Sequence, residues 1–131
     1  MYDFMRAPVG TALVEVPPLK ADYIHRAYIR RKGDDFDLDA LKQYALALKA
    51  ELPQVLIGYC QTGLTSKKHC WPTGVPVTST EHNAMLLRGP RGEVIEYSSG
   101  QYLNDPTLPT TQEYLLSWSK ALVAAGADVI D

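Results

Sequence analysis

The sequence lacks the features that define several large classes of protein. No apolar run approaches the roughly 20 residues needed to span a bilayer, and the first residues lack the layout of a cleavable secretion signal. The 13 Lys and Arg residues against 15 Asp and Glu give a formal net charge of -2. This balance argues against a nucleic-acid binder that relies on a broad basic field. We therefore expect a cytoplasmic protein, or one delivered from the cytoplasm without a cleavable signal, with neither membrane nor nucleic acid as partner.

Cysteine is scarce, and the motifs that hold cofactors are missing. Two cysteines, Cys60 and Cys70, do not make a disulfide scaffold. They could pair with each other across the loop that joins them, but without an export signal we expect both to be reduced. There is no Gly-rich phosphate loop, no His-Glu-x-x-His and no Gly-x-Ser-x-Gly, so no cofactor is expected. Together with His69 and His82 the cysteines could supply four zinc ligands, but their spacing fits no common zinc pattern. We expect no metal.

The pattern along the chain predicts an α+β fold in a single domain, residues 1–131. With 46% hydrophobic composition, the chain is long enough to bury one core. The expected elements are a strand at 11–16, helices at 19–32 and 37–52, a strand at 54–60, a loop at 61–81, strands at 82–88 and 93–98, and a last helix capped by Thr110 or Thr111 and closed by Gly126. We thus predict a small antiparallel sheet of about four strands flanked by three helices.

The two later helices have the clearest signals. Apolar residues at helical spacing form a stripe in each of them. In the first these are Leu38, Leu41, Ala45, Leu48 and Leu52, and in the last Leu115, Trp118, Leu122 and Ala125.

His82 and Glu96 are the first candidates for chemistry. If 82–88 and 93–98 form a hairpin around Gly89-Pro90-Arg91-Gly92, His82 and Glu96 lie at the same end of it. An imidazole can then act as a general base, with the carboxylate fixing its tautomer. The alternative is a surface histidine and a cross-strand polar pair.

A nucleophile is the next requirement. If strand 54–60 pairs antiparallel with 82–88, Cys60 lies near His82, which could draw the thiol to thiolate. Cys70 is an alternative nucleophile in the loop, with Lys67 and Lys68 beside it. Either cysteine could instead be a small buried hydrophobe.

The long loop and the hairpin supply candidate substrate contacts. A structureless loop of this length is typical of a lid or a binding loop. Trp71 in that loop could cover a substrate or anchor the loop to the core. Asn83, Ser98 and Gln101 complete the predicted substrate-binding set, with Gln101 a possible oxyanion donor.

The segment from His82 to Pro109 resembles the C-terminal half of papain-fold and transglutaminase-like cysteine enzymes, above all the papain-fold toxin domains of bacterial polymorphic toxin systems. The likeness lies in His82 opening a strand, then Glu96-Tyr97-Ser98, then Gln101-Tyr102. It implies a papain-like or transglutaminase-like core and a Cys-His-acid triad that acts on amide bonds of a protein substrate by hydrolysis, glutamine deamidation or transamidation.

The resemblance breaks where the family has its nucleophile, at the start of the helix before these strands. Here that stretch reads Phe36-Asp37-Leu38-Asp39-Ala40-Leu41, without cysteine. Three explanations stay open: Cys60 supplies the thiol, Ala40 or Ala45 marks an inactivating substitution, or the domain only binds. The leading hypothesis is a thiol-dependent acyl-transfer enzyme of the toxin or effector type. The competing one is a non-catalytic protein-binding module, such as an immunity-type or phage-encoded inhibitor.

Overall fold

The computed structural model describes residues 22–24, 31–32, 35–36, 38–59, 64–66 and 69–130. Its contacts divide into two compact units, which we describe one at a time. Unit 1 comprises residues 1–61 and 119–131, and unit 2 comprises residues 62–118. Helix α4 (Pro109–Ala124) contributes its residues up to Trp118 to unit 2 and the remainder to unit 1. The prediction of a single domain stays a prediction.

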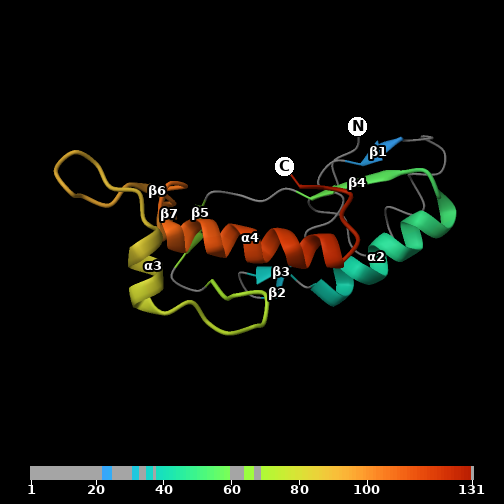
Figure 1. Ribbon diagram of the computed structural model, residues 1–131, viewed down its shortest axis with the longest axis horizontal. Helices are drawn as coiled ribbons and strands as arrows, with labels where there is room; N and C mark the ends of the chain where they lie inside the picture. The colour runs from blue at the N-terminus through green and yellow to red at the C-terminus, as the bar shows by residue number, and fades with distance from the viewer. Residues whose placement is uncertain are drawn as a thin grey trace. The chain divides into compact units, whose positions relative to one another are not determined.

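Unit 1 is built around a short parallel sheet. Strand β4 (Leu56–Tyr59) pairs in parallel with β1 (Tyr23–Ile24) and with β8 (Val129–Ile130), in the order β1-β4-β8. A separate antiparallel pair joins β2 (Arg31–Lys32) to β3 (Asp35–Phe36). Figure 1 labels these strands.

Helix α2 (Leu38–Glu51) packs its apolar stripe into the core of unit 1. Leu41 and Leu48 are fully buried, as the helical spacing predicts. Burial removes apolar surface from water, which is the main favourable contribution to folding. The core cluster consists of Ile24, Leu41, Tyr44, Ala45, Leu48, Val55, Ile57, Tyr59, Leu122, Ala125 and Ala127.

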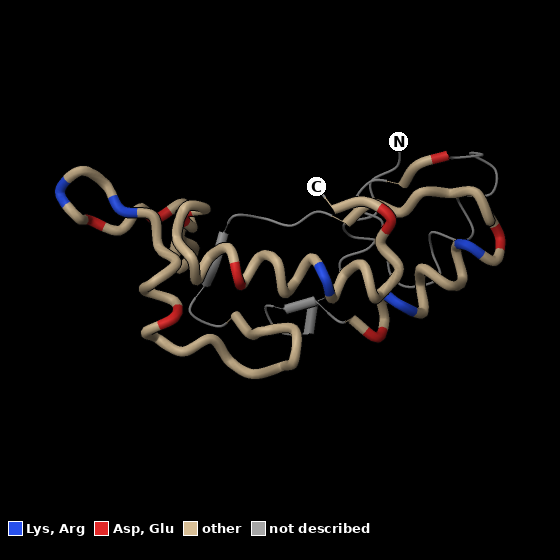
Figure 2. The backbone as a smooth tube through the Cα atoms, viewed as in Figure 1, with Lys and Arg blue, Asp and Glu red and all other residues tan. Residues whose placement is uncertain are grey.

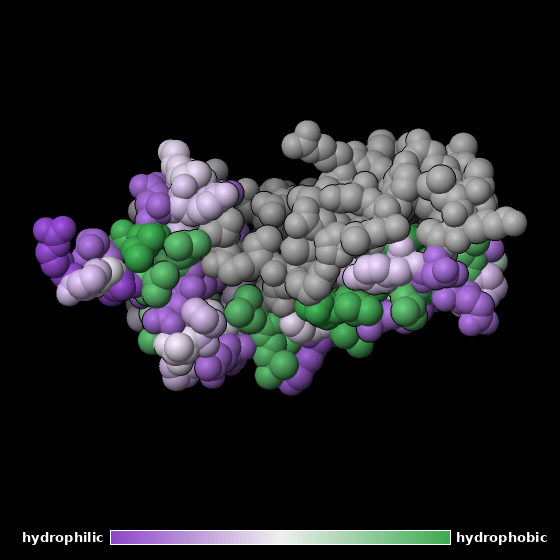
Figure 3. Space-filling view, turned by 90° about the horizontal axis from the view of Figure 1, so that it is seen from above, coloured by the Kyte–Doolittle hydropathy of each residue, from purple (hydrophilic) through white to green (hydrophobic). Residues whose placement is uncertain are grey.

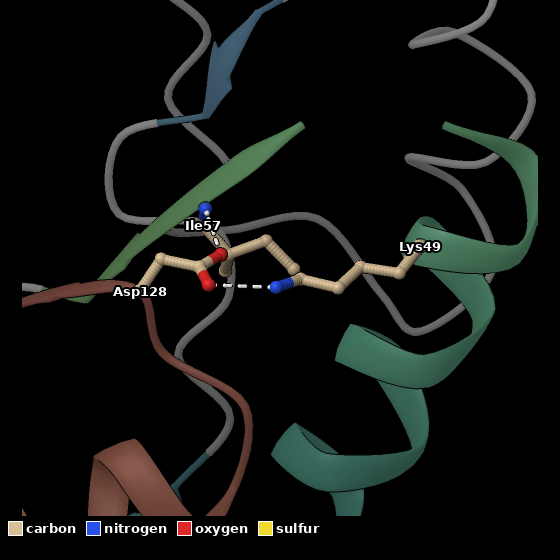
Figure 4. Close-up of polar contacts among 3 residues, drawn as sticks. All are labelled: Lys49, Ile57 and Asp128. Carbon is tan, nitrogen blue, oxygen red and sulfur yellow. Dashed lines mark hydrogen bonds and ion pairs between the residues drawn. The ribbon is translucent and has the colours of Figure 1, made fainter. Parts of the chain in front are cut away.

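A polar clamp ties the C-terminal segment of unit 1 to β4 and α2 (Figure 4). The Asp128 carboxylate accepts hydrogen bonds from Lys49 Nζ at 2.7 Å and from the Ile57 backbone N–H at 3.0 Å. Partial burial raises the pKa of Asp128, but these two hydrogen bonds outweigh it and hold the pKa below its usual value. Burial, followed by the Asp128 charge, raises the pKa of the Tyr59 phenol. The Tyr59 hydroxyl donates to the Leu41 carbonyl at 3.3 Å.

Unit 2 contains a second small sheet and helix α3 (Ser79–Met85). Strands β5 (Leu64–Ser66), β7 (Gln101–Leu103) and β6 (Glu96–Ser98) are antiparallel in the order β5-β7-β6. At the end of β7, three backbone segments meet in a closed ring of hydrogen bonds. Leu87 N–H donates to the Leu103 carbonyl, Leu103 N–H to that of Ile95, and Ile95 N–H to that of Leu87, at 2.8, 3.1 and 3.1 Å.

The α+β class and two of the helices are as predicted, but the single four-stranded antiparallel sheet is wrong. The described strands form three small sheets, and the one that contains β4 is parallel. Ile57 and Tyr59, which share one face of β4, are almost completely buried, whereas Leu56 on the other face is 50% exposed. The predicted pairing of 54–60 with 82–88 is therefore not found among the described residues.

Other predicted elements also change. Residues 23–24 and 31–32, expected in a helix, are strands, and the predicted strand 11–16 lies outside the described residues. The predicted loop 61–81 contains β5 and the start of α3. The last helix ends as expected, with Gly126 at a φ of 108°.

Candidate functional site

His82 lies on a helix, because the residues before it form a capping box. The Thr78 hydroxyl accepts from the Glu81 backbone N–H at 3.2 Å, while the Glu81 carboxylate accepts from the Thr78 N–H at 2.7 Å. This reciprocal pair begins α3, and His82 N–H continues it by donating to the Thr78 carbonyl at 2.8 Å. The prediction that His82 opens a strand at 82–88 is wrong. Hydrogen bonds from Thr78, with a smaller one from the Trp71 side chain, lower the pKa of Glu81.

A pocket of about 190 Å³ opens on one face of α3. Its described lining consists of Val77, Ser79, His82 and Asn83. Positions 79, 82 and 83 share one face because residues three and four apart are neighbours on a helix. The pocket thus presents a hydroxyl, an imidazole and a carboxamide. Its volume is below the roughly 300–1,000 Å³ of most small-molecule sites, which suits a single side chain better than a whole cofactor.

His82 is 5% exposed, and its ring meets the Tyr102 ring edge-on at 5.6 Å between centroids. Tyr102 is also the cross-strand partner of Glu96. Directly opposite residues of an antiparallel pair have side chains on the same face. Tyr102 therefore neighbours both of the residues that the sequence predicts to cooperate.

Glu96 and two predicted substrate contacts lie on the β6–β7 hairpin. An oxygen of Glu96 accepts from the Gly100 N–H at 2.8 Å, and the Ser98 hydroxyl donates to Gln101 Oε1 at 2.9 Å. All of these side chains are exposed. Glu96 pairs with Tyr102 and His82 is helical, so the prediction that the two residues lie at the same end of one hairpin is wrong.

Trp71 and Cys70 belong to a short hairpin that packs on α4 within unit 2. Trp71 N–H donates to the Val75 carbonyl at 2.8 Å, and Cys70 forms an antiparallel bridge with Pro76. The Trp71 ring meets the Tyr114 ring edge-on at 5.3 Å.

Two more side chains tie this hairpin to α4. The Tyr114 hydroxyl lies 3.1 Å from His69 Nδ1, and Trp118 Nε1 donates to the Cys70 carbonyl at 3.1 Å. These contacts fix the backbone on both sides of the partly exposed Cys70.

Two further buried polar residues adjoin the last turn of α3. The Thr111 hydroxyl donates to the Met85 carbonyl at 3.2 Å, and the Asp105 N–H donates to the same oxygen at 2.8 Å. Asn104 is 7% exposed, and its side-chain amide has no hydrogen-bond partner among the residues that the structure describes. Asn104 directly follows β7 and was not among the predicted site residues.

Cys60, the predicted nucleophile, lies outside the described residues. Within the described ranges no three His, Cys, Asp or Glu side chains are grouped to hold a metal ion. In that same part of the chain, no helix combines the length and apolar character that crossing a bilayer requires.

Three comparisons with known proteins were made. No family model, no curated protein and no solved structure matches this chain.

Proposed function

We propose that the chain is a thiol-dependent acyl-transfer enzyme with a papain-like or transglutaminase-like core, acting on amide bonds of a protein substrate as a toxin or effector domain. His82 is the general base, Glu96 orients it, and Cys60 is the nucleophile. The thiolate attacks the amide carbonyl, and His82 first takes the thiol proton and then returns it to the departing amine. Water or another amine then releases the acyl group from sulfur.

The observation that supports this proposal most directly is the placement of His82. Histidine is intermediate in its tendency to be buried, yet this imidazole is 5% exposed and lines a pocket. Burial excludes water, and the pocket gives a substrate group access to the ring. Asn83 in the same lining offers a carboxamide to hold that group.

Tyr102 gives a second line of support. Its ring packs on His82 and its backbone pairs with Glu96, so both residues of the proposed pair lie next to the same side chain. Ser98, Gln101 and Trp71 remain the proposed substrate contacts, with Gln101 as an oxyanion donor.

The test is the rate at which each thiol reacts with iodoacetamide at neutral pH, measured by peptide mass spectrometry. An activated thiol should react at least about tenfold faster than a free cysteine, and His82→Gln should remove that excess. His69→Gln is the matched control, because it removes the other described imidazole. Circular dichroism shows whether each variant is folded, and His82→Asn provides a second substitution if His82→Gln is not.

The position of the fast thiol decides between the alternatives. Fast labelling of Cys60 that depends on His82 supports the proposal, whereas fast labelling of Cys70 moves the nucleophile into the 69–77 hairpin. Slow labelling of both, unchanged in His82→Gln, overturns the catalytic proposal.

The second candidate is a non-catalytic protein-binding module. Val75 and Tyr97 favour it, because their side chains are 57% and 67% exposed on hairpins of unit 2. Exposed aromatic and aliphatic side chains are common anchors in protein interfaces.

A further inference from the structure

The hairpin between α3 and β6, residues 86–95, projects beyond the β5-β7-β6 sheet of unit 2 (Figure 1); we name it the finger. Arg88 and Val94 form an antiparallel β-bridge. Nearer the tip, Gly89 N–H donates to the Glu93 carbonyl at 2.8 Å, and Gly92 N–H donates to the Gly89 carbonyl at 2.9 Å.

Local sequence sets the conformation of the tip of the finger. Pro90 fixes φ at the second turn position, and Gly92 supplies the positive φ, 83°, that follows such a turn. At its base, the closed ring of Leu87, Ile95 and Leu103 ties the finger to the sheet. The finger is therefore ordered before any partner arrives, which lowers the entropic cost of binding.

The cations of unit 2 gather on this tip. Arg88 and Arg91 are the only Lys or Arg in the described part of unit 2, residues 64–66 and 69–118. In Figure 2 the projecting loop carries blue segments, the colour of Lys and Arg. Arg88 Nη1 donates to the Gly92 carbonyl at 3.0 Å, which uses one of the five N–H donors of this guanidinium. Both arginines are exposed.

Glu93 is the acidic residue closest to these two arginines in the sequence. The Glu93 carboxylate accepts from the backbone N–H of Arg91 at 3.0 Å. Elsewhere in the unit, Glu81, Glu96 and Asp105 accept hydrogen bonds from residues near them in the chain. With two exposed arginines against one carboxylate, residues 86–95 carry a formal charge of +1.

Behind the tip the finger is apolar. Leu87, Val94 and Ile95 are half-buried, and Tyr97 on the adjoining strand is 67% exposed. Figure 3 shows hydrophobic surface directly beside the hydrophilic end. Arginine and tyrosine around an apolar patch are the residue types enriched at interface hot spots.

We propose that the finger is a docking element for an acidic patch on a partner protein, with Arg88 and Arg91 binding carboxylates and Tyr97 covering the contact. Guanidinium groups suit carboxylates because their planar forks form paired, charge-assisted hydrogen bonds. A protein patch fits better than nucleic acid, because a long polyanion would also meet the acidic side chains of a chain whose net charge is -2. Docking by the finger does not require catalysis at His82.

The test uses the full chain labelled with ¹⁵N and an oligoglutamate peptide that carries one tyrosine, titrated at low salt. We expect chemical-shift changes confined to 86–95 and Tyr97, with affinity that falls as salt is added. Arg88→Gln with Arg91→Gln should weaken binding at least about tenfold. The charge-matched control is Lys42→Gln with Lys120→Gln, two exposed lysines outside unit 2, which should bind like the unaltered chain.

Three results would overturn the proposal. The first is no shift in the finger at any peptide concentration. The second is an equal loss of affinity in the lysine control, which would mean that only total charge matters. The third is tighter binding of an oligothymidylate than of the peptide at equal salt, which would make the partner a nucleic acid.

Discussion

Gly126, which follows α4, allows a prediction that can be worked out from the structure. Its φ of 108° lies in a region that residues other than glycine rarely adopt. A Cβ built at this position would lie 2.6 Å from the Cβ of Ala45 on α2. Gly126→Ala therefore combines backbone strain, about 1–2 kcal/mol, with an overpacking cost of about 1–3 kcal/mol. We expect the free energy of unfolding to fall by roughly 2–5 kcal/mol.

The two contributions separate in a double-mutant cycle with Ala45→Gly. This second change removes the methyl group that the new Cβ would meet, at its own cost of about 1–2 kcal/mol for glycine within a helix and for lost burial. The double variant should be less destabilised than the sum of the single variants, by roughly 1–3 kcal/mol, the overpacking part alone.

Urea unfolding followed by circular dichroism measures these differences, and an unchanged dependence on urea shows that the compared states remain the same. Additivity within about 0.5 kcal/mol would refute the close approach of Gly126 to Ala45. A cost under about 1 kcal/mol for Gly126→Ala alone would refute the strained backbone as well.

Two other predictions concern polar contacts. Asp128→Asn should lower stability by about 1–2 kcal/mol, since it removes the ion pair with Lys49 and weakens the hydrogen bond from Ile57. Because the folded pKa of Asp128 is lowered, its contribution is complete above the unfolded value of about 3.9 and is lost as the pH falls below it. Urea midpoints measured at neutral pH and near pH 3 check this. A difference in stability between the variant and the unaltered chain that is as large near pH 3 as at neutral pH would contradict it. Thr78→Ala should cost about 1 kcal/mol and speed amide hydrogen exchange across 82–85, while Thr80→Ala, on the same helix but outside the capping box, should leave it nearly unchanged.

The sequence contains enough to predict the long helices and the hairpin turn. Leu41 and Leu48 repeat at the helical period, and Gly126 marks a helix end, so α2 and α4 follow from local rules. The turn at 89–92 follows from Pro90 and Gly92. These signals succeed because the residues that determine each element lie within it.

The errors arise where distant or competing signals decide. Strand β4 pairs with residues 23–24 and 129–130, and such short parallel pairs leave no local trace in the sequence. For α3 the signal was present, since Thr78 and Glu81 match a capping box, but the apolar residues from Ala84 to Leu87 suggested a strand. Ala84 and Met85 complete the helix, whereas Leu86 and Leu87 lie beyond its end.

The sequence predicted some of the residues of the candidate site, but not how they are arranged. His82 and Glu96 were expected at the same end of one hairpin, and they instead lie on a helix and a strand, each next to Tyr102. Ser79 and Val77 were overlooked as pocket residues because residue 79 was assigned to a loop, where spacing along a helix has no meaning.

The closed ring of Leu87, Ile95 and Leu103 has a consequence for how this chain can vary. Each of the three residues donates one backbone hydrogen bond and accepts another. The hairpin is therefore supported by main-chain N–H and carbonyl groups, which every amino acid except proline possesses. The side chains of Arg88 and Arg91 take no part in that ring. Selection could therefore replace them, and so change what the molecule recognises, as long as Pro90 and Gly92 keep the shape of the turn.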